Sequence, residues 1–487
     1  MEAHSLGSGR KNTTGYHLLT GATGLLGSYL LRDFLLAGRH MAVLVRPSKS
    51  ESARQRVETL LRQWELSMET TLPRPVVLEG DLNEIDLGLD NRTLNWIERH
   101  CTSVFHNAAS LVFRGDDPDR EPHLSNVEGT RRMLELCRCT GIRQFHHVST
   151  AYVCGLREGR VLESDVDVGQ TPGNVYEKTK LQAEILVRTA NFIDPPTIYR
   201  PAIIVGDSQT GYTTTYHGFY APLKLAHTMA SKVARGATAG DLLVAALGIK
   251  TDDRKNFVPV DWVSAVMCHI HGRPEFHGRT YHVTSPHPPL VLEMAAVMQE
   301  VVEDLSPIGD ADSSWNLDGE WFAKTFRDQL GIYGAYWRDD PQFDMTNTFR
   351  AVPHLPCPKL DREMMSQLAR FAIDTNFGRV RRTKHKPDFD IHNHMRRVLR
   401  SHVEIPEGGP PIAHLGIQVD GPGGGQWELL VRDGRLVAID DGVSARSTAV
   451  FYVNSATFCS MVHGKLSVSQ AVQAGQARIE GNGMDRR

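Results

Sequence analysis

The stretch LLTGATGLLGSYLL, residues 18–31, places three glycines between two apolar runs, spaced as Gly21-x-x-Gly24-x-x-Gly27. The residues before Gly21 can end a short buried strand, whereas those after Gly27 recur at helical spacing. In a strand–turn–helix unit the first glycine permits the tight turn, the second lets the backbone approach a pyrophosphate, and the third lets the helix pack on the strand. A purely structural glycine turn is the alternative for this motif alone. Together with the free N–H groups at the helix start, the stretch predicts a dinucleotide cradle.

Composition and charge describe an ordinary globular chain. Its 487 residues exceed one ordinary core, so two or three domains are expected. A net charge of -3 gives no sign of a nucleic-acid partner. The polar N-terminus lacks the core of a signal peptide, no apolar run can cross a bilayer, and the cysteines have neither zinc-like nor disulfide-like spacing. We expect a cytoplasmic protein with no integral membrane segment and at most peripheral membrane contact.

The pattern of apolar residues predicts the domains. From residue 15 to about 206, short apolar runs alternate with amphipathic stretches, which predicts an α/β fold with a doubly wound parallel sheet of the Rossmann type. From about 207 to 378 the pattern loosens, and we expect a small substrate cap. Residues 379–404 are strongly basic and predict a linker. Residues 405–487 predict a C-terminal α+β module with antiparallel strands, and residues 1–14 a polar tail.

The end of the second predicted strand bears on the choice of cofactor. Val43-Leu-Val-Arg46 ends about nineteen residues after Gly27, where an acid would bind the free ribose hydroxyl of NAD and an arginine accommodates the 2′-phosphate of NADP. Arg46 therefore favours NADPH, with NADH left open. Arg54 or Arg56 could add a second charge-assisted contact.

Two further strand ends carry residues that suit a nucleotide. An aspartate there can accept from an adenine amino group, and small residues let a ribose lie close to the backbone. A nucleotide laid across the rim of the sheet requires such residues at successive strand ends. They are Asp81 and Leu82 after the third strand, and Asn107, Ala108 and Ala109 after the fourth.

The catalytic candidates follow this half of the sequence. Tyr176 and Lys180 are four apart and share one face of a predicted helix. A phenol has an ordinary pKa near 10, which a neighbouring ammonium lowers, and the same lysine can hold the nicotinamide ribose. The hydroxyl of Thr150, at the end of the fifth strand, can hold a substrate oxygen. Asn126 can anchor the helix that carries a proton-relay water. The pair alone is a common structural pattern, but after a dinucleotide half it predicts redox chemistry.

These motifs together resemble a known family. TGATGLLG, HNAA, NVEGT, VSTAYVCG, YEKTK and RPAIIVG are similar to the extended short-chain dehydrogenases/reductases, over a domain of residues 15–378. LVR with SARQRVETLLRQW, LEGDLNEIDLGL and FHHVSTAYV resemble the branch with thioester reductase domains and fatty acyl-CoA reductases. The resemblance implies Tyr176 as acid/base, Lys180 as its activator and Thr150 as hydroxyl partner. It also implies a cofactor site of Gly21, Thr23, Gly24, Leu25, Leu26, Arg46, Pro201 and Ala202.

The C-terminal module resembles a second family. WELLVRDGRLVAI and STAVFYVNSATFCSMVHGKLSVSQAVQAGQARIEGN are similar to the sterol-carrier-protein family over residues 405–487, which implies an apolar tunnel for a lipid tail. A plain dimerisation module is the alternative, and a homodimer is one expected partner state. No metal is expected, because His269-x-His271 and His392-x-His394 have no accompanying Cys, Asp or Glu set.

The sequence thus predicts an NAD(P)H-dependent reductase. Its first-choice substrate is a ketone or aldehyde carbonyl on a lipophilic metabolite that bears an isoprenoid or fatty acyl tail. An acyl thioester is second, because thioester reductases usually follow an adenylation domain and a carrier protein that this sequence does not show. The alternatives from other classes are a nucleotide-sugar epimerase or dehydratase, and a non-catalytic lipid-transfer or NADP-sensing protein.

Overall fold

A computed structural model describes most of the chain. The predicted polar tail and most of the predicted basic linker fall outside the described residues. The described ranges are 15–48, 51–113, 115–230, 250, 252–305, 338–378, 389–398, 412–421, 423–433, 435–443 and 447–481.

The chain forms two compact units. One comprises residues 1–33, 42–44 and 80–380, and the other residues 34–41, 45–79 and 381–487. All four predicted catalytic residues belong to the first unit.

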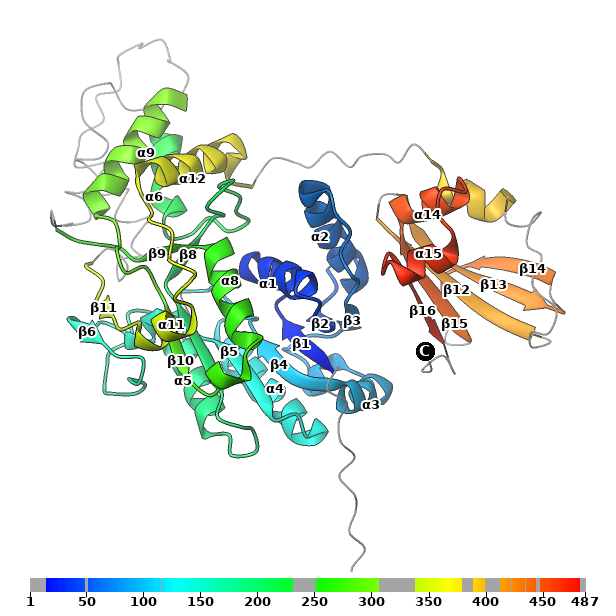
Figure 1. The fold of residues 1–487 in the computed structure, drawn as a ribbon, viewed down its shortest axis with the longest axis horizontal. Coiled ribbons are helices and arrows are strands. Elements are labelled where there is room, and N and C mark those ends of the chain that lie inside the picture. The colour runs from blue at the N-terminus through cyan, green and yellow to red at the C-terminus, as the bar shows by residue number, and fades with distance from the viewer. Residues whose placement is uncertain are drawn as a thin grey trace, which may run out of the picture. The chain divides into compact units, whose positions relative to one another are not determined.

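A seven-stranded sheet confirms the predicted doubly wound α/β fold (Figure 1). Its order is β10-β7-β5-β4-β1-β2-β3, and the pairs β1–β4, β4–β5, β5–β7 and β7–β10 are parallel. Strands buried on both faces read as near-continuous apolar runs, as in MAVLV of β2, where all five residues are buried. The strands are β1 (Tyr16–Thr20), β2 (Met41–Val45), β3 (Val76–Glu79), β4 (Cys101–His106), β5 (Gln144–Val148), β7 (Thr197–Pro201) and β10 (Thr280–Val283).

Polar side chains set where the helices between these strands begin. Ser52 and Gln55 form a reciprocal capping box at α2, and Asp90 and Asn174 accept backbone N–H groups at the starts of α3 and α5. Within the described part of the chain, no helix is long and apolar enough to cross a membrane. The helices are α1 (Leu25–Leu36), α2 (Ala53–Met68), α3 (Asn91–His100), α4 (Gly129–Thr140), α5 (Val175–Thr189) and α8 (Val260–His271).

The region in which the sequence predicts a cap has a core of its own. Three helices, α6 (Tyr220–Ala230), α9 (Val291–Leu305) and α12 (Arg362–Asp374), pack through a buried cluster that includes Leu223, Met298 and Leu368. Val205 and Phe257 of one short parallel ribbon, β8 (Ile203–Val205) with β9 (Phe257–Pro259), belong to the same cluster. A second parallel ribbon, β6 (Arg160–Val161) with β11 (Gln342–Phe343), packs in a separate small cluster with Ala151. Helix α11 (Thr346–Ala351) follows β11.

The C-terminal module has a five-stranded sheet in the order β14-β13-β12-β15-β16. The sheet is mixed rather than antiparallel throughout, because β12 and β15 pair in parallel. Within the predicted linker, Ile391 and Met395 are buried against Trp427 in the module's apolar cluster, so residues 389–398 pack on the module. The elements are β12 (Ile412–Asp420), β13 (Gly425–Arg432), β14 (Arg435–Asp441), β15 (Ala449–Asn454), β16 (Ala477–Gly481), α13 (Ile391–Asn393), α14 (Ser455–Val462) and α15 (Val468–Gln473).

Candidate active site

The glycine turn between β1 and α1 has the shape of a phosphate cradle. Gly21 has a φ of +72°, and a Cβ there would lie 2.8 Å from backbone atoms of Ala108. A Cβ on Gly27 would lie 1.9 Å from the carbonyl oxygen of Gly21, whereas one on Gly24 would meet that atom at 3.4 Å. Because α1 begins at Leu25, directly after the turn, its first N–H groups lack intrahelical partners. The turn therefore fits a dinucleotide pyrophosphate.

The end of β4 is tied to the end of β1 beside this turn. The Oγ1 atom of Thr20 accepts the backbone N–H groups of Asn107 (3.1 Å) and Ala108 (3.0 Å). The side-chain amide of Asn107 donates to the carbonyl of Gly21 at 3.4 Å. Ala109 is exposed. The end of β4 therefore lies beside the glycine turn.

The remaining predicted cofactor residues have these positions. Asp81 closes a turn by accepting the N–H of Asn83 at 3.0 Å, and the carbonyl of Leu82 accepts from Arg132 at 2.6 Å. The guanidinium of Arg56 donates to the backbone carbonyl of Arg46 at 2.6 Å. Leu25, Leu26, Pro201 and Ala202 are buried, and Thr23 is half-buried.

The predicted tyrosine and threonine come together. Tyr176 lies in the first turn of α5, and Thr150 follows β5. Burial raises the pKa of Tyr176 well above its usual value and the charge of Glu177 raises it further, whereas a side-chain hydrogen bond with Thr150 acts in the opposite direction. Phe113 packs edge-on against Tyr176, with ring centroids 5.5 Å apart.

Lys180 lies one turn further along α5 but does not act on the phenol as we expected. Its ammonium donates to the carbonyl of Val148 at 2.6 Å, and the side chain is buried. Burial lowers the pKa of Lys180 to about 8, and the charge of Glu184 works against that fall. The expected lowering of the Tyr176 pKa is therefore wrong for this structure, because burial of the phenol and the charge of Glu177 both raise that pKa.

Asn126 joins two parts of the site. It lies in a π-helical turn, Leu124–Glu128, just before α4. Its Oδ1 accepts the N–H of Ser110 at 2.7 Å, and its Nδ2 donates to the carbonyl of Ser110 and to Oγ1 of Thr179, at 3.1 and 3.0 Å. Because Thr179 is on α5, Asn126 connects the loop after β4 to the helix that carries Tyr176.

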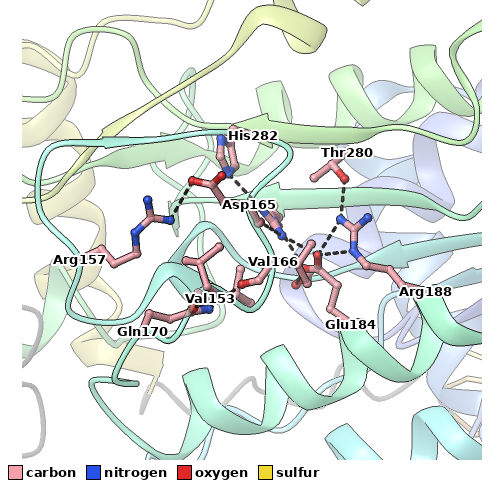
Figure 2. Close-up of polar contacts among 12 residues, drawn as sticks. Val153, Arg157, Asp165, Val166, Gln170, Glu184, Arg188, Thr280 and His282 are labelled. Carbon is pink, nitrogen blue, oxygen red and sulfur yellow. Dashed lines mark hydrogen bonds and ion pairs between the residues drawn. The ribbon is translucent and has the colours of Figure 1, made fainter.

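The sequence reasoning missed a buried ionic network around Glu184 on α5 (Figure 2). Arg200 donates to Glu184 through Nη2 at 2.6 Å and through Nε at 3.1 Å, and both side chains are fully buried. Ser149 donates to Glu184 at 2.6 Å, and Arg188 pairs with it at 2.8 Å. The sequence feature that could have revealed Glu184 is its spacing, because it follows Lys180 by four residues and so shares its helix face.

Together, the cradle, the Tyr-x-x-x-Lys helix and the strand-end hydroxyl define an NAD(P)-dependent oxidoreductase of the short-chain dehydrogenase/reductase type. Residues 19–267 match the NAD-binding family described as "Male sterility protein", and the chain belongs to this family. This family is the thioester reductase branch of the extended short-chain dehydrogenases/reductases, which the sequence motifs predict.

The chain is similar to parts of larger fungal proteins. It is 26% identical over 324 residues to "Nonribosomal peptide synthetase asaC" of Aspergillus flavus, which covers 63% of this chain and 28% of that protein. It is 26% identical over 397 residues to "Aldehyde reductase lnaA" of the same species, covering 74% of this chain and 36% of that protein. The chain thus spans about a third of the length of these relatives.

A solved structure shows the same architecture. The terminal R domain from the myxalamid PKS-NRPS biosynthetic pathway has a TM-score of 0.58 and 26% identity, and the match covers 75% of this chain and 92% of that one. The archaeal thiolation-reductase di-domain matches with a TM-score of 0.56 at 17% identity, which supports the fold alone.

Proposed function

We propose that this protein uses NADPH to reduce a carbonyl group, with an aldehyde as the first-choice substrate. The observation that carries the proposal is the pairing of Tyr176 with Thr150 on a chain that also has a fitting dinucleotide cradle. The similarity to a protein named as an aldehyde reductase supports this substrate class. When bound, the cofactor supplies the hydride that the carbonyl carbon receives.

The residues of the chain supply the other half of the reaction. Thr150 and Tyr176 hold the carbonyl oxygen, and Tyr176 gives its phenolic proton to that oxygen, so that the aldehyde becomes a primary alcohol. The phenol is protonated at neutral pH, as proton donation requires, and burial raises its pKa. Lys180 holds the nicotinamide ribose, and the cradle at Gly21, Gly24 and Leu25 holds the pyrophosphate.

An acyl thioester is the second candidate, favoured by the similarity to a terminal R domain. Addition of hydride to the thioester carbonyl gives a hemithioacetal, whose carbon–sulfur bond then breaks to release a thiol and an aldehyde. The same two hydroxyl groups would hold the oxygen, so the geometry suits either carbonyl. Carrier-bound substrates belong to this proposal as well.

Product analysis tests both candidates. Purified protein is incubated with NADPH or NADH and with long-chain aldehydes, prenylated ketones or acyl-CoA thioesters, while cofactor oxidation and products are followed. The proposal expects NADPH-dependent alcohol formation from aldehydes, and free thiol would establish thioester reduction. No cofactor oxidation with any carbonyl, or retained NAD with interconversion of nucleotide sugars, would overturn it.

Lipid binding by the C-terminal module stays a prediction of the sequence. The described residues show an apolar cluster that includes Trp427, Leu429 and Phe458. A fluorescent fatty-acid titration of the full chain tests the prediction. The homodimer and peripheral membrane contact are likewise predictions, which light scattering and vesicle sedimentation would check.

A further inference from the structure

A single carboxylate connects the three elements that carry the proposed active-site residues. Glu184 lies on α5, the helix of Tyr176 and Lys180. Its two oxygens accept from Ser149, which directly precedes Thr150, and from Arg200, which directly precedes Pro201. The N–H of Ser149 also donates to the carbonyl of Tyr199 at 2.7 Å, so the ends of β5 and β7 are held to each other and to the helix.

The carboxylate is ionised in spite of complete burial. Burial alone would raise the pKa of Glu184, but the charges and hydrogen bonds of Arg200 and Arg188, with the hydroxyl of Ser149, bring that pKa below its usual value. Arg200 is anchored from its far side as well, because its Nη2 donates to the carbonyl of Asp165 at 2.6 Å. Arg188 in turn donates to Thr280 at 2.6 Å, as Figure 2 shows. Each partner of Glu184 is therefore held in place by a second bond.

We infer that Glu184 is a positioning residue of the reductase centre, which aligns the Thr150 and Pro201 strand ends with α5 and keeps Lys180 in its cationic form. The inference rests on the proposed function for its catalytic readout. A carboxylate one helical turn from a buried lysine stabilises the ammonium. His106 of β4 and His147 of β5 also lie close enough to Lys180 to be affected by its charge, and burial holds the pKa of each below its usual value, so both rings are neutral near pH 7 and add no positive charge beside the ammonium.

A merely structural role predicts something different. Buried ion pairs often contribute little to stability, and breaking one destabilises a fold without altering the chemistry of the molecules that remain folded. A positioning role predicts that folded variants have altered chemistry. The readout must therefore be measured on folded protein and must report the charge of Lys180.

The experiment compares Glu184→Gln with Glu163→Gln in the full chain. Glu163 is also buried but accepts from the backbone N–H groups of His282 and Asn347, far in the sequence from the catalytic helix. NADPH affinity is measured by fluorescence across pH, together with steady-state turnover. NADPH affinity should fall at high pH, where Lys180 loses its proton. Loss of the Glu184 charge lowers the Lys180 pKa, so the midpoint of this alkaline fall should lie at least about one pH unit lower. Glu163→Gln should leave that fall where it is in the unaltered chain.

A second variant covers the case in which Glu184→Gln does not fold. Glu184→Asp keeps the charge but shortens the reach to Ser149 and Arg200. It should leave the alkaline fall in place and reduce turnover by folded protein about tenfold or more, since small misplacements of reacting groups are costly.

The outcomes separate the two proposals. If the unaltered chain binds NADPH but reduces no carbonyl, the proposed function fails, and the affinity profiles still test Glu184. If Glu184→Gln and Glu163→Gln share one pH profile, or Glu184→Asp lowers only thermal stability, Glu184 has a structural role and the inference is overturned.

Discussion

Replacing Gly27 with alanine should disrupt the cradle, whereas the same change at Gly24 should leave the fold intact. The added Cβ at Gly27 would lie 1.9 Å from the carbonyl oxygen and 2.7 Å from the carbonyl carbon of Gly21. Both are backbone atoms, so the turn itself must move. At Gly24 the nearest atom would be that same oxygen at 3.4 Å, which is an ordinary contact. The two variants make the same chemical change with different steric consequences.

The expected cost follows from these contacts. Overpacking costs about 1–3 kcal/mol, and the short distance at Gly27 points to the upper end. Because Gly27 lies inside α1, alanine also recovers about 1 kcal/mol of helix propensity, which leaves a net loss of about 2 kcal/mol. That loss corresponds to a fall in Tm of about 3 °C for a unit of more than 300 residues. Urea unfolding and thermal melts measure both quantities.

Cofactor affinity completes the comparison. Gly27→Ala should weaken NADPH binding through the displaced turn. Gly24→Ala should weaken it as well, because its Cβ stands where the pyrophosphate approaches the backbone, but without loss of stability. The reasoning is refuted if Gly27→Ala is as stable as the unaltered chain, or if Gly24→Ala loses as much stability as Gly27→Ala.

Three further changes test other parts of the account. Acid should destabilise the fold, because burial depresses the pKa of His146 and His147 in the folded state. The stability that these neutral rings allow is present above the unfolded pKa of about 6.5 and is lost as pH falls below it. His147→Leu should therefore flatten the dependence of Tm on pH between about 7.5 and 5. Asn126→Ala should lower the unfolding free energy by about 1–3 kcal/mol, since it leaves buried partners unsatisfied, and urea titration measures the loss. Arg46→Ala should reduce the preference for NADPH over NADH about tenfold or more, and unchanged relative affinities would exclude Arg46 from the 2′-phosphate site.

Local patterns in the sequence predict much of this fold. The glycine spacing around Gly21 defines a turn whose steric demands are backbone properties, and the apolar run of β2 reports burial directly. The placement of Tyr176 beside Thr150 also follows, because parallel strands direct their carboxyl ends to one edge of the sheet. These inferences depend on contacts within a strand–helix unit or on topology alone.

Other features depend on burial and on contacts that periodicity does not encode. The direction of the Tyr176 pKa was mispredicted, because the spacing to Lys180 is visible in the sequence and the desolvation of the phenol is not. The Glu184–Arg200 pair joins a helix to a strand, and each residue looks like an ordinary surface charge by itself. The parallel pairing of β12 with β15 likewise depends on the path of the chain between them rather than on either strand.

The central claim is that the hydroxyl of Tyr176 protonates the substrate oxygen. Stopped-flow oxidation of bound NADPH by an aldehyde should be slowed about 100-fold or more in Tyr176→Phe, with cofactor affinity and Tm nearly unchanged. Oxidation by the phenylalanine variant at the rate of the unaltered chain would contradict the claim.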